Sequence, residues 1–219
     1  MKKFIIFILS IIIMQPVSAK NIQGVWHNDL RTLFQHNNAI IDTINIRTFN
    51  AKDTNSNEII DEDEESGNFI NAIDELDDLV KQGINTIHVL PITPVGKIKA
   101  FGTAGSLYAI SNFTDINPQL VSKTSSLSGI EQAKRFIREC HKRNIRVIID
   151  LPSCGSYDMF VEHPEYYMKD ENQNPIIPLD WTDVRLLNCG TEHKLNDDLL
   201  TLHKKFIYML IYITADGIR

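Results

Sequence analysis

The sequence predicts an α/β fold in which short strands and amphipathic helices alternate along the chain. That alternation implies parallel strands joined by right-handed crossovers. No G-x-G-x-x-G turn follows the first predicted strand, which disfavours a dinucleotide-binding sheet. Long polar loops after successive strands favour a parallel (β/α)8 barrel of the TIM type, because such barrels build their ligand sites from these loops.

The first half of the chain predicts two strands and one helix. Residues 40–49 are rich in β-branched side chains, which is typical of a strand. Apolar residues recur at helical spacing from 69 to 80, and Gly83 is placed to end that helix. Residues 85–90 predict a second strand, and a loop with little regular structure follows from 93 to 118.

The second half continues the alternation. Ser128 is suited to cap a helix that runs to residue 143, and residues 145–151 form an apolar run typical of a strand buried on both faces. An irregular segment then precedes a helix over 196–212 and a strand over 214–219. Because a closed barrel needs eight strands, we expect an incomplete barrel of about the first four strands, with an open edge and a tendency to aggregate.

Residues 1–19 have the order of a secretory signal peptide. Lys2 and Lys3 precede an apolar run from 4 to 14, and small residues at 17–19 offer a cleavage site. The apolar run is shorter than the roughly 20 residues of a membrane-spanning helix, although an uncleaved anchor is the alternative. We therefore expect a secreted or periplasmic protein whose mature domain, over 20–219, has no membrane association after cleavage.

The charge balance and the cysteines argue against several classes of protein. The chain has 22 Lys+Arg against 28 Asp+Glu and a net charge of −6, so it lacks the basic footprint of a nucleic-acid binder. The three cysteines, Cys140, Cys154 and Cys189, form no C-x-x-C pair, which leaves a zinc knuckle or a thioredoxin-like motif without support. A disulfide between Cys154 and Cys189 is one option that their spacing does not decide.

The segment over 53–61 predicts a calcium loop. Oxygen-bearing side chains at alternate positions, with one backbone carbonyl, suit a hard cation such as Ca²⁺. The expected ligands are Asp53, Asn55, Asn57, the carbonyl of Ile59, and Asp61. Glu58 stands where such loops place the glycine of a sharp turn, and a solvated acidic loop is the alternative interpretation.

Several stretches, in order, resemble the α-amylase family of glycoside hydrolases, of the family 13 type. The resemblance covers most of the chain, from about residue 41 to residue 219. It is carried by Arg47-Thr48-Phe49 with the 53–61 loop, by IHVLPI over 87–92, by SLYAISNFTDINP over 106–118, by RVIID over 146–150, and by ADGIR over 215–219. It implies the N-terminal half of the family's catalytic barrel.

The resemblance also implies that three residues bind substrate. Tyr108 has the position of the tyrosine that stacks against the sugar at the cleavage site. Asp150 matches the aspartate that follows the third strand, and Arg219 matches the arginine that supports the nucleophilic aspartate two residues later. Because Asp150 and Arg219 end neighbouring strands, we expect that they could pair. The family's sugar-binding histidine falls on Gly155, which removes one hydrogen-bond donor to the sugar.

These observations predict a truncated member of that family, acting on α-glucans or α-linked oligosaccharides and inactive alone. Retaining glycosidases place two carboxylates about 5 Å apart, and the family's counterparts would follow Arg219, so no catalytic residue is assigned. One alternative is a non-catalytic carbohydrate-binding or accessory protein that depends on Tyr108. Another is a half enzyme completed by a separate C-terminal piece, in which case mixing the two should restore hydrolysis.

Overall fold

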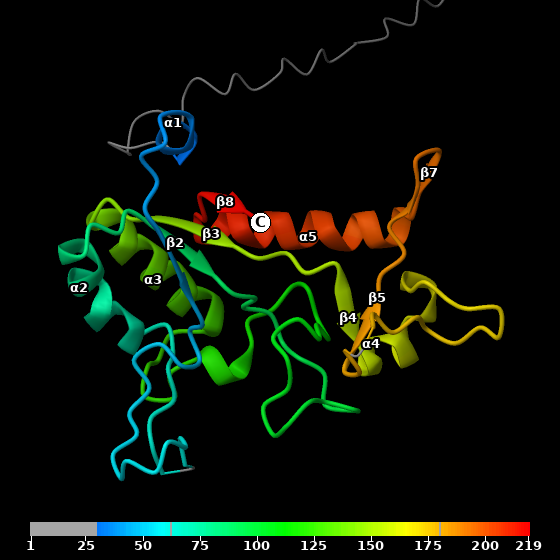
Figure 1. The fold of residues 1–219 in the computed structure, drawn as a ribbon, viewed down its shortest axis with the longest axis horizontal. Helices are drawn as coiled ribbons and strands as arrows, with labels where there is room; N and C mark the ends of the chain where they lie inside the picture. Colours follow the sequence, from blue (N-terminus) through cyan, green and yellow to red (C-terminus); the bar gives the residue numbers. More distant parts are fainter. Residues whose placement is uncertain (1–29, 62, 180) are drawn as a thin grey trace, which may run out of the picture.

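The centre of the fold is a four-stranded parallel sheet with the strand order β1-β2-β3-β8 (Figure 1). The computed structural model describes residues 30–61, 63–179 and 181–219, so the predicted signal segment lies outside the described residues. The strands are β1 (Ile41–Ile44), β2 (Thr86–Val89), β3 (Arg146–Ile149) and β8 (Gly217–Ile218). The predicted parallel α/β architecture is confirmed, and the sheet does not close into a barrel within the described part of the chain.

Helices cover one face of this sheet. Ser128 Oγ accepts a hydrogen bond from the Glu131 amide at 3.3 Å and so caps α3 as predicted. Gly83 ends α2 with a φ of +82°, a conformation that glycine adopts without a steric penalty. The helical segments are η2 (Asn71–Glu75), α2 (Leu76–Lys81), η3 (Pro118–Leu120), α3 (Gly129–Lys142) and α5 (Asp197–Ile213).

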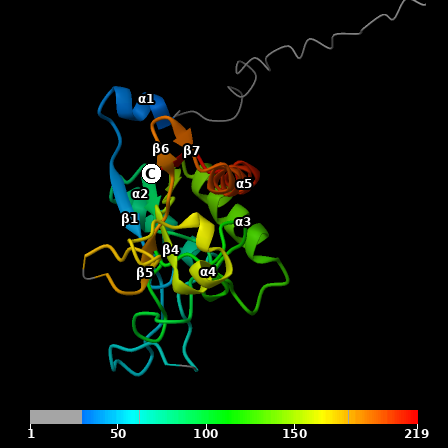
Figure 2. The same ribbon diagram turned by 90° about the vertical axis from the view of Figure 1, so that its right-hand side faces the viewer.

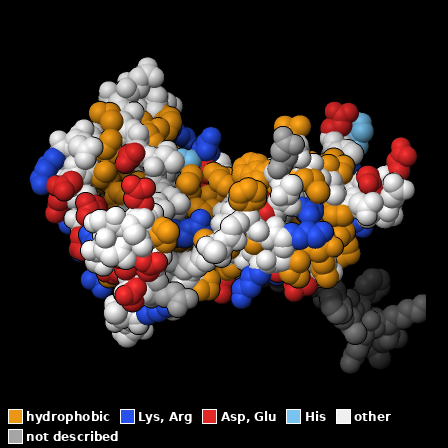
Figure 3. Space-filling model, turned by 60° about the horizontal axis from the view of Figure 1, so that its bottom comes forward, with side chains coloured by type: hydrophobic (Ala, Val, Ile, Leu, Met, Phe, Trp, Pro, Cys, Tyr) orange, Lys and Arg blue, Asp and Glu red, His pale blue; other side chains and the backbone are white. Residues whose placement is uncertain are grey.

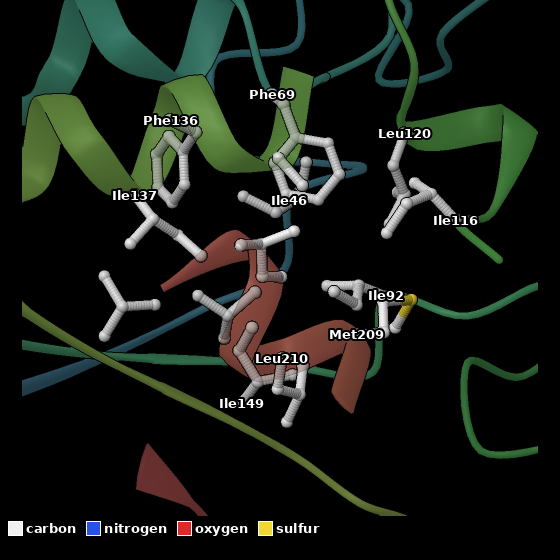
Figure 4. Packing of buried hydrophobic residues seen from close by; sticks show 14 of the residues in the cluster. Ile46, Phe69, Ile92, Ile116, Leu120, Phe136, Ile137, Ile149, Met209 and Leu210 are labelled. Atoms are coloured by element: carbon white, nitrogen blue, oxygen red, sulfur yellow. The ribbon is translucent and has the colours of Figure 1, made fainter. Parts of the chain in front are cut away.

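The main core lies between the sheet and these helices. Figure 4 shows side chains of α3, α5 and the neighbouring loops pointing into one interior, with Phe136 and Leu210 among them. Removing side chains of this size from water contributes about 1.5–3 kcal/mol each. The buried strand residues that face the helices are Ile44, Ile87, Val89, Val147 and Ile149.

The opposite face of the sheet is covered only in part. The short helix α1 (Leu30–Gln35) lies against it, and a Cβ atom on Gly217 would stand 2.9 Å from the Leu30 side chain. Glycine at position 217 therefore allows α1 to approach β8. A hollow of about 540 Å³ remains on this face, lined by Phe34, Ile41, Thr43, His88, Leu90, Ile148, Ile218 and Arg219.

The segment from 152 to 191, predicted as irregular, contains a small antiparallel sheet. β4 (Cys154–Ser156) pairs with β5 (Val184–Leu186), and Figure 2 shows α4 grouped with them. Strands this short carry too little alternation to be predicted from sequence. The remaining small elements are α4 (Tyr157–Glu162), η4 (Pro164–Tyr166), β6 (Gly190–Thr191) and β7 (Lys194–Leu195).

All four predicted strands are longer than the strands that form, and the difference is largest for the first and the last. β1 ends at Ile44 rather than at residue 49, because the Asn45 carbonyl accepts the Phe49 amide at 2.8 Å and turns the backbone. The last strand is β8, two residues long, because Thr214 takes a left-handed φ of +66° at the end of α5. In both places local backbone hydrogen bonds, Phe49 to Asn45 and Thr214 to Ile211, hold residues outside the β conformation.

Helix α5 carries apolar side chains on its exposed side as well as on its buried side. Phe206 and Ile213 are fully buried, whereas Tyr208 is 68% exposed and Ile211 is 64% exposed. None of the helices in the described ranges has both the length and the apolar character needed to cross a membrane. Because Tyr208 and Ile211 are exposed, this side of α5 is a surface that favours association with other apolar surfaces.

We expect Ile211→Lys to reduce self-association of the chain without loss of helix. The new charge would remain in water, because Ile211 is 64% exposed, and the buried side of α5 would be unchanged. Size-exclusion chromatography with light scattering measures the association, and far-UV circular dichroism measures the helix. Leu210→Lys is the matched control and should lower Tm, because Leu210 is 3% exposed. Equal aggregation of wild type and Ile211→Lys would contradict the expectation.

Candidate functional site

Asp150 lies at the centre of a polar cluster at the carboxyl end of the parallel sheet. It follows β3 directly, and it is 4% exposed. Its Oδ1 lies 2.7 Å from His88 Nε2, and its Oδ2 accepts a hydrogen bond from the Tyr108 hydroxyl at 2.7 Å. Arg219 Nη1 lies 3.7 Å from Oδ1, so the predicted pairing of Asp150 with Arg219 is confirmed. The three residues expected to bind substrate are therefore in one place.

His88 extends this cluster into the interior of the sheet. It lies on β2, and the Thr43 hydroxyl of β1 lies 3.2 Å from its Nδ1. Since an ionised carboxylate only accepts hydrogen bonds, the tautomer with the proton on Nε2 suits both contacts: Nε2 donates to Asp150, and Nδ1 accepts from the Thr43 hydroxyl. This contact of His88 was not predicted from the sequence. The sequence feature that could have indicated this contact is a histidine within an otherwise apolar strand, next to the strand that Asp150 follows.

The loop that carries Tyr108 is held in place from two sides. Arg47 Nη1 donates to the carbonyl oxygens of Ala104 and Gly105 at 3.1 and 3.3 Å, and burial lowers the pKa of this arginine. The Ser106 amide donates to Asp183 Oδ2 at 3.2 Å. These contacts position the phenol of Tyr108 over Asp150, although most of the loop has no regular structure.

A second aromatic side chain lies beside Tyr108. The ring centroids of Tyr108 and Trp181 are 5.8 Å apart, and their planes are inclined by 52°. Trp181 is 49% exposed, so part of its indole surface is open to solvent. Trp181 was not predicted to belong to the site, because residue spacing alone does not show that the loop around 181 returns to the loop around 108.

Gly155, at the position where the resemblance places the family's histidine, has no space for a side chain. A Cβ atom on this residue would stand 2.3 Å from Tyr167 Oη and 3.4 Å from the carbonyl oxygen of Ile110. The Tyr167 hydroxyl donates to the Ser156 carbonyl at 3.1 Å, which fixes it in that place. Tyr167 therefore occupies the space that a side chain at position 155 would need.

The 53–61 loop brings the side chains of four predicted metal ligands together. Asp53 accepts hydrogen bonds from the amides of Asn57 and Glu58, and Asp61 Oδ2 accepts from both Asn55 Nδ2 and Asn57 Nδ2 at 2.9 and 3.0 Å. Glu58 adopts a φ of +66°, so it takes the left-handed conformation that glycine supplies in such loops. Figure 3 shows acidic side chains gathered on the side of the molecule that carries this loop and α2.

The donor set of this loop suits a hard cation in composition. Asparagine and aspartate oxygens are ligands that Ca²⁺ accepts, but the two amides must turn their oxygens inward to serve. The described residues contain no cluster of three or more His, Cys, Asp or Glu side chains that could hold a metal ion.

Glu64 closes the same loop through several hydrogen bonds. Two backbone amides and the Thr54 hydroxyl donate to Glu64 Oε1, and the Asp61 amide donates to Oε2. These bonds, that of Asp61 foremost, lower the pKa of Glu64 to about 2.

The three cysteines are free thiols in the structure. Cys140 is buried and Cys189 is exposed, while Cys154 lies beside the site with its Sγ 3.4 Å from the carbonyl oxygen of Tyr108. Burial raises the pKa of the Cys154 thiol to about 11. The optional disulfide between Cys154 and Cys189 is therefore not formed, and the Cys154 thiol is protonated at neutral pH.

A parallel sheet with helices on one face, and with a polar site at the carboxyl ends of its strands, defines the class as a partial β/α barrel. No family model matches the chain. Among solved structures, an α-amylase from Lactobacillus plantarum is similar with a TM-score of 0.62 and 25% identity, over 81% of this chain and 36% of that chain. A maltogenic α-amylase from Thermotoga neapolitana is similar with a TM-score of 0.60 and 25% identity, over 83% and 38% of the two chains.

Curated relatives agree with the structural neighbours. The chain is 26% identical over 133 residues to the chloroplastic isoamylase SU1 of Zea mays, and 27% identical over 135 residues to the chloroplastic isoamylase 1 of Oryza sativa subsp. japonica. Each match covers 58% of this chain and 16% of the relative. The chain is thus homologous to the α-amylase family of glycoside hydrolases, and it spans a small part of the length of these relatives.

We expect Asp150→Asn to lower the pKa of Tyr108. Burial, then the hydrogen bond and the charge of Asp150, raise that pKa to about 12 in the folded chain. Since the folded state holds the phenolic proton more tightly than the unfolded chain, this stabilisation is full below about pH 10 and is lost as the pH rises towards 12. Titration of ¹³Cζ-labelled tyrosines by NMR, with Tyr108→Phe for assignment, measures the shift.

Tyr212 is the internal control for that titration. Its hydroxyl donates to Glu131 at 2.6 Å, and this hydrogen bond raises its pKa without involving Asp150. Asp150→Asn should leave the Tyr212 titration unchanged. A Tyr108 pKa that also stays unchanged would contradict the hydrogen bond between Tyr108 and Asp150.

Proposed function

We propose that the chain carries the substrate-binding part of an α-amylase-family glycoside hydrolase that acts on α-glucans or α-linked oligosaccharides. The observation that carries this proposal is the convergence of Tyr108, Asp150 and Arg219 at the carboxyl end of the sheet. An aromatic ring suits the apolar C–H face of a pyranose, while the carboxylate and the guanidinium suit its hydroxyl groups. The names of the relatives, α-amylases and isoamylases, support an α-glucan as the substrate class.

We further propose that this chain alone does not hydrolyse its ligand. Retaining glycosidases need two carboxyl groups about 5–5.5 Å apart. The partners of Asp150 are an imidazole, a phenol and a guanidinium, so its surroundings are those of a binding and orienting group. The nucleophile and the acid would come from further β/α units, either in a longer product of the same gene or in a separate C-terminal piece.

We also propose that residues 1–19 export the chain to the periplasm or the cell exterior. Residues 20–219 would then be the mature domain.

We expect the chain to bind maltoheptaose, and we expect Tyr108→Ala to weaken that binding by about tenfold, a loss typical of one well-placed aromatic contact. Isothermal titration calorimetry measures the affinity, and reducing-sugar release from starch measures hydrolysis, which should be absent. Tyr208→Ala is the matched control, because Tyr208 lies on the exposed side of α5 and is 68% exposed. Starch hydrolysis by the purified chain would overturn the non-catalytic part of the proposal, and the lack of maltoheptaose binding would overturn the binding part.

We propose that the 53–61 loop binds Ca²⁺ through Asp53, Asn55, Asn57, Asp61 and the carbonyl oxygen of Ile59. We expect Ca²⁺ to raise Tm, because a ligand that binds only the folded state stabilises it, and Asp61→Asn to abolish most of that increase. Differential scanning calorimetry measures Tm, and terbium luminescence reports the metal directly. Asp63→Asn is the control, since it removes an acidic charge at a position outside the ligand set. Equal responses of the two variants would indicate general charge screening and contradict a specific site.

A further inference from the structure

We infer that Trp181 provides a second stacking contact for the glycan, next to that of Tyr108, so that the site binds two consecutive units of an α-linked glucan. This inference rests on the proposed function, because it names how that same site would hold its ligand. The observation behind it is the pair of neighbouring aromatic rings, 5.8 Å apart between centroids and inclined by 52°.

The ring of Tyr108 is fixed before any ligand arrives. Its hydroxyl donates to Asp150 at 2.7 Å, its backbone amide donates to Ser106 Oγ at 3.2 Å, and Cys154 Sγ lies 3.4 Å from its carbonyl oxygen. The hydroxyl holds the ring itself, and the other two contacts hold the backbone of Tyr108, so the residue loses little conformational freedom on binding, which favours affinity. Tyr108 is therefore a fixed neighbour for the indole of Trp181.

Trp181 does not have the burial of a core tryptophan. It is 49% exposed, and its backbone amide donates to the Pro178 carbonyl at 3.0 Å in a tight turn. Leu179, in the same turn, is 97% exposed, so the turn projects into solvent. The half-open indole of Trp181, next to Tyr108, thus leaves an aromatic surface on which a ligand could stack.

The inclination of the two rings selects the kind of ligand. Planes inclined by 52° cannot both lie flat on the same face of one pyranose ring. They suit two successive sugar units whose faces are turned relative to each other, as in the curved chain of an α-linked glucan. A flat β-linked chain presents nearly parallel faces and should fit less well. Arg219, whose side chain is 69% exposed and lies 3.7 Å from the Asp150 carboxylate that Tyr108 also contacts, is available for the hydroxyl groups at the edge of the sugar.

The test uses the full chain and maltotetraose, with calorimetric titration of wild type and variants. We expect Trp181→Ala to raise Kd about tenfold and Trp181→Phe to keep most of the affinity, since a phenyl ring retains a stacking face. Leu179→Ala is the matched control in the same turn and should change nothing. Unchanged Tm values would show that the loss concerns the contact and not the fold.

Fluorescence gives a second, direct readout. The chain has 2 tryptophans, Trp26 and Trp181, so Trp26→Phe leaves Trp181 as the only indole. Maltotetraose should then shift or quench its emission, and cellotetraose, its β-linked isomer, should have a much smaller effect.

The outcomes separate the two proposals. If wild type binds maltotetraose and Tyr108→Ala weakens that binding while Trp181→Ala does not, the second contact is overturned and the proposed function stands. If wild type binds neither maltotetraose nor maltoheptaose in the calorimeter, both are overturned. If cellotetraose binds as tightly as maltotetraose, the assignment of an α-linked ligand to the aromatic pair is overturned.

Discussion

The buried carboxylate of Asp150 is the constraint on which the arrangement of the site depends. A carboxylate removed from water is costly unless charged or hydrogen-bonding groups surround it. Here those groups come from a loop, from two other strands of the sheet and from the end of the chain: Tyr108, His88 with Thr43 behind it, and Arg219. The requirement of one carboxylate thus ties together segments that are far apart in the sequence.

The polar cluster around Asp150 lies on the face of the sheet that the helices leave uncovered. On the helix-covered face, alternate strand residues are aliphatic and fully buried. On the other face the residues of the same strands include His88 and Thr43, and α1 covers only part of them. Half of the side chains of one strand therefore pack in the core, and the other half face the polar cluster. This division follows from the alternation of side chains along a β-strand.

Much of the fold and part of the site could be predicted from sequence. The helices around Leu79 and Phe136 and the strand before Asp150 were predictable because their apolar periodicity is long and uninterrupted. The position of Trp181 beside Tyr108, and the hydrogen bond of His88 to Asp150, were not predictable, because they depend on how loops and strands meet in space. Short strands such as β4 and β5 are set by their partners and not by their own sequence.

Gly155 and Tyr167 have a consequence for how this site could change over evolutionary time. A side chain at 155 would collide with the Tyr167 hydroxyl, so the two positions are epistatic. A larger residue could enter at 155 only if Tyr167 moved or were replaced, and either change would disrupt the buried hydrogen bond from the Tyr167 hydroxyl to the Ser156 carbonyl. A substitution at one position therefore changes the effect of a substitution at the other.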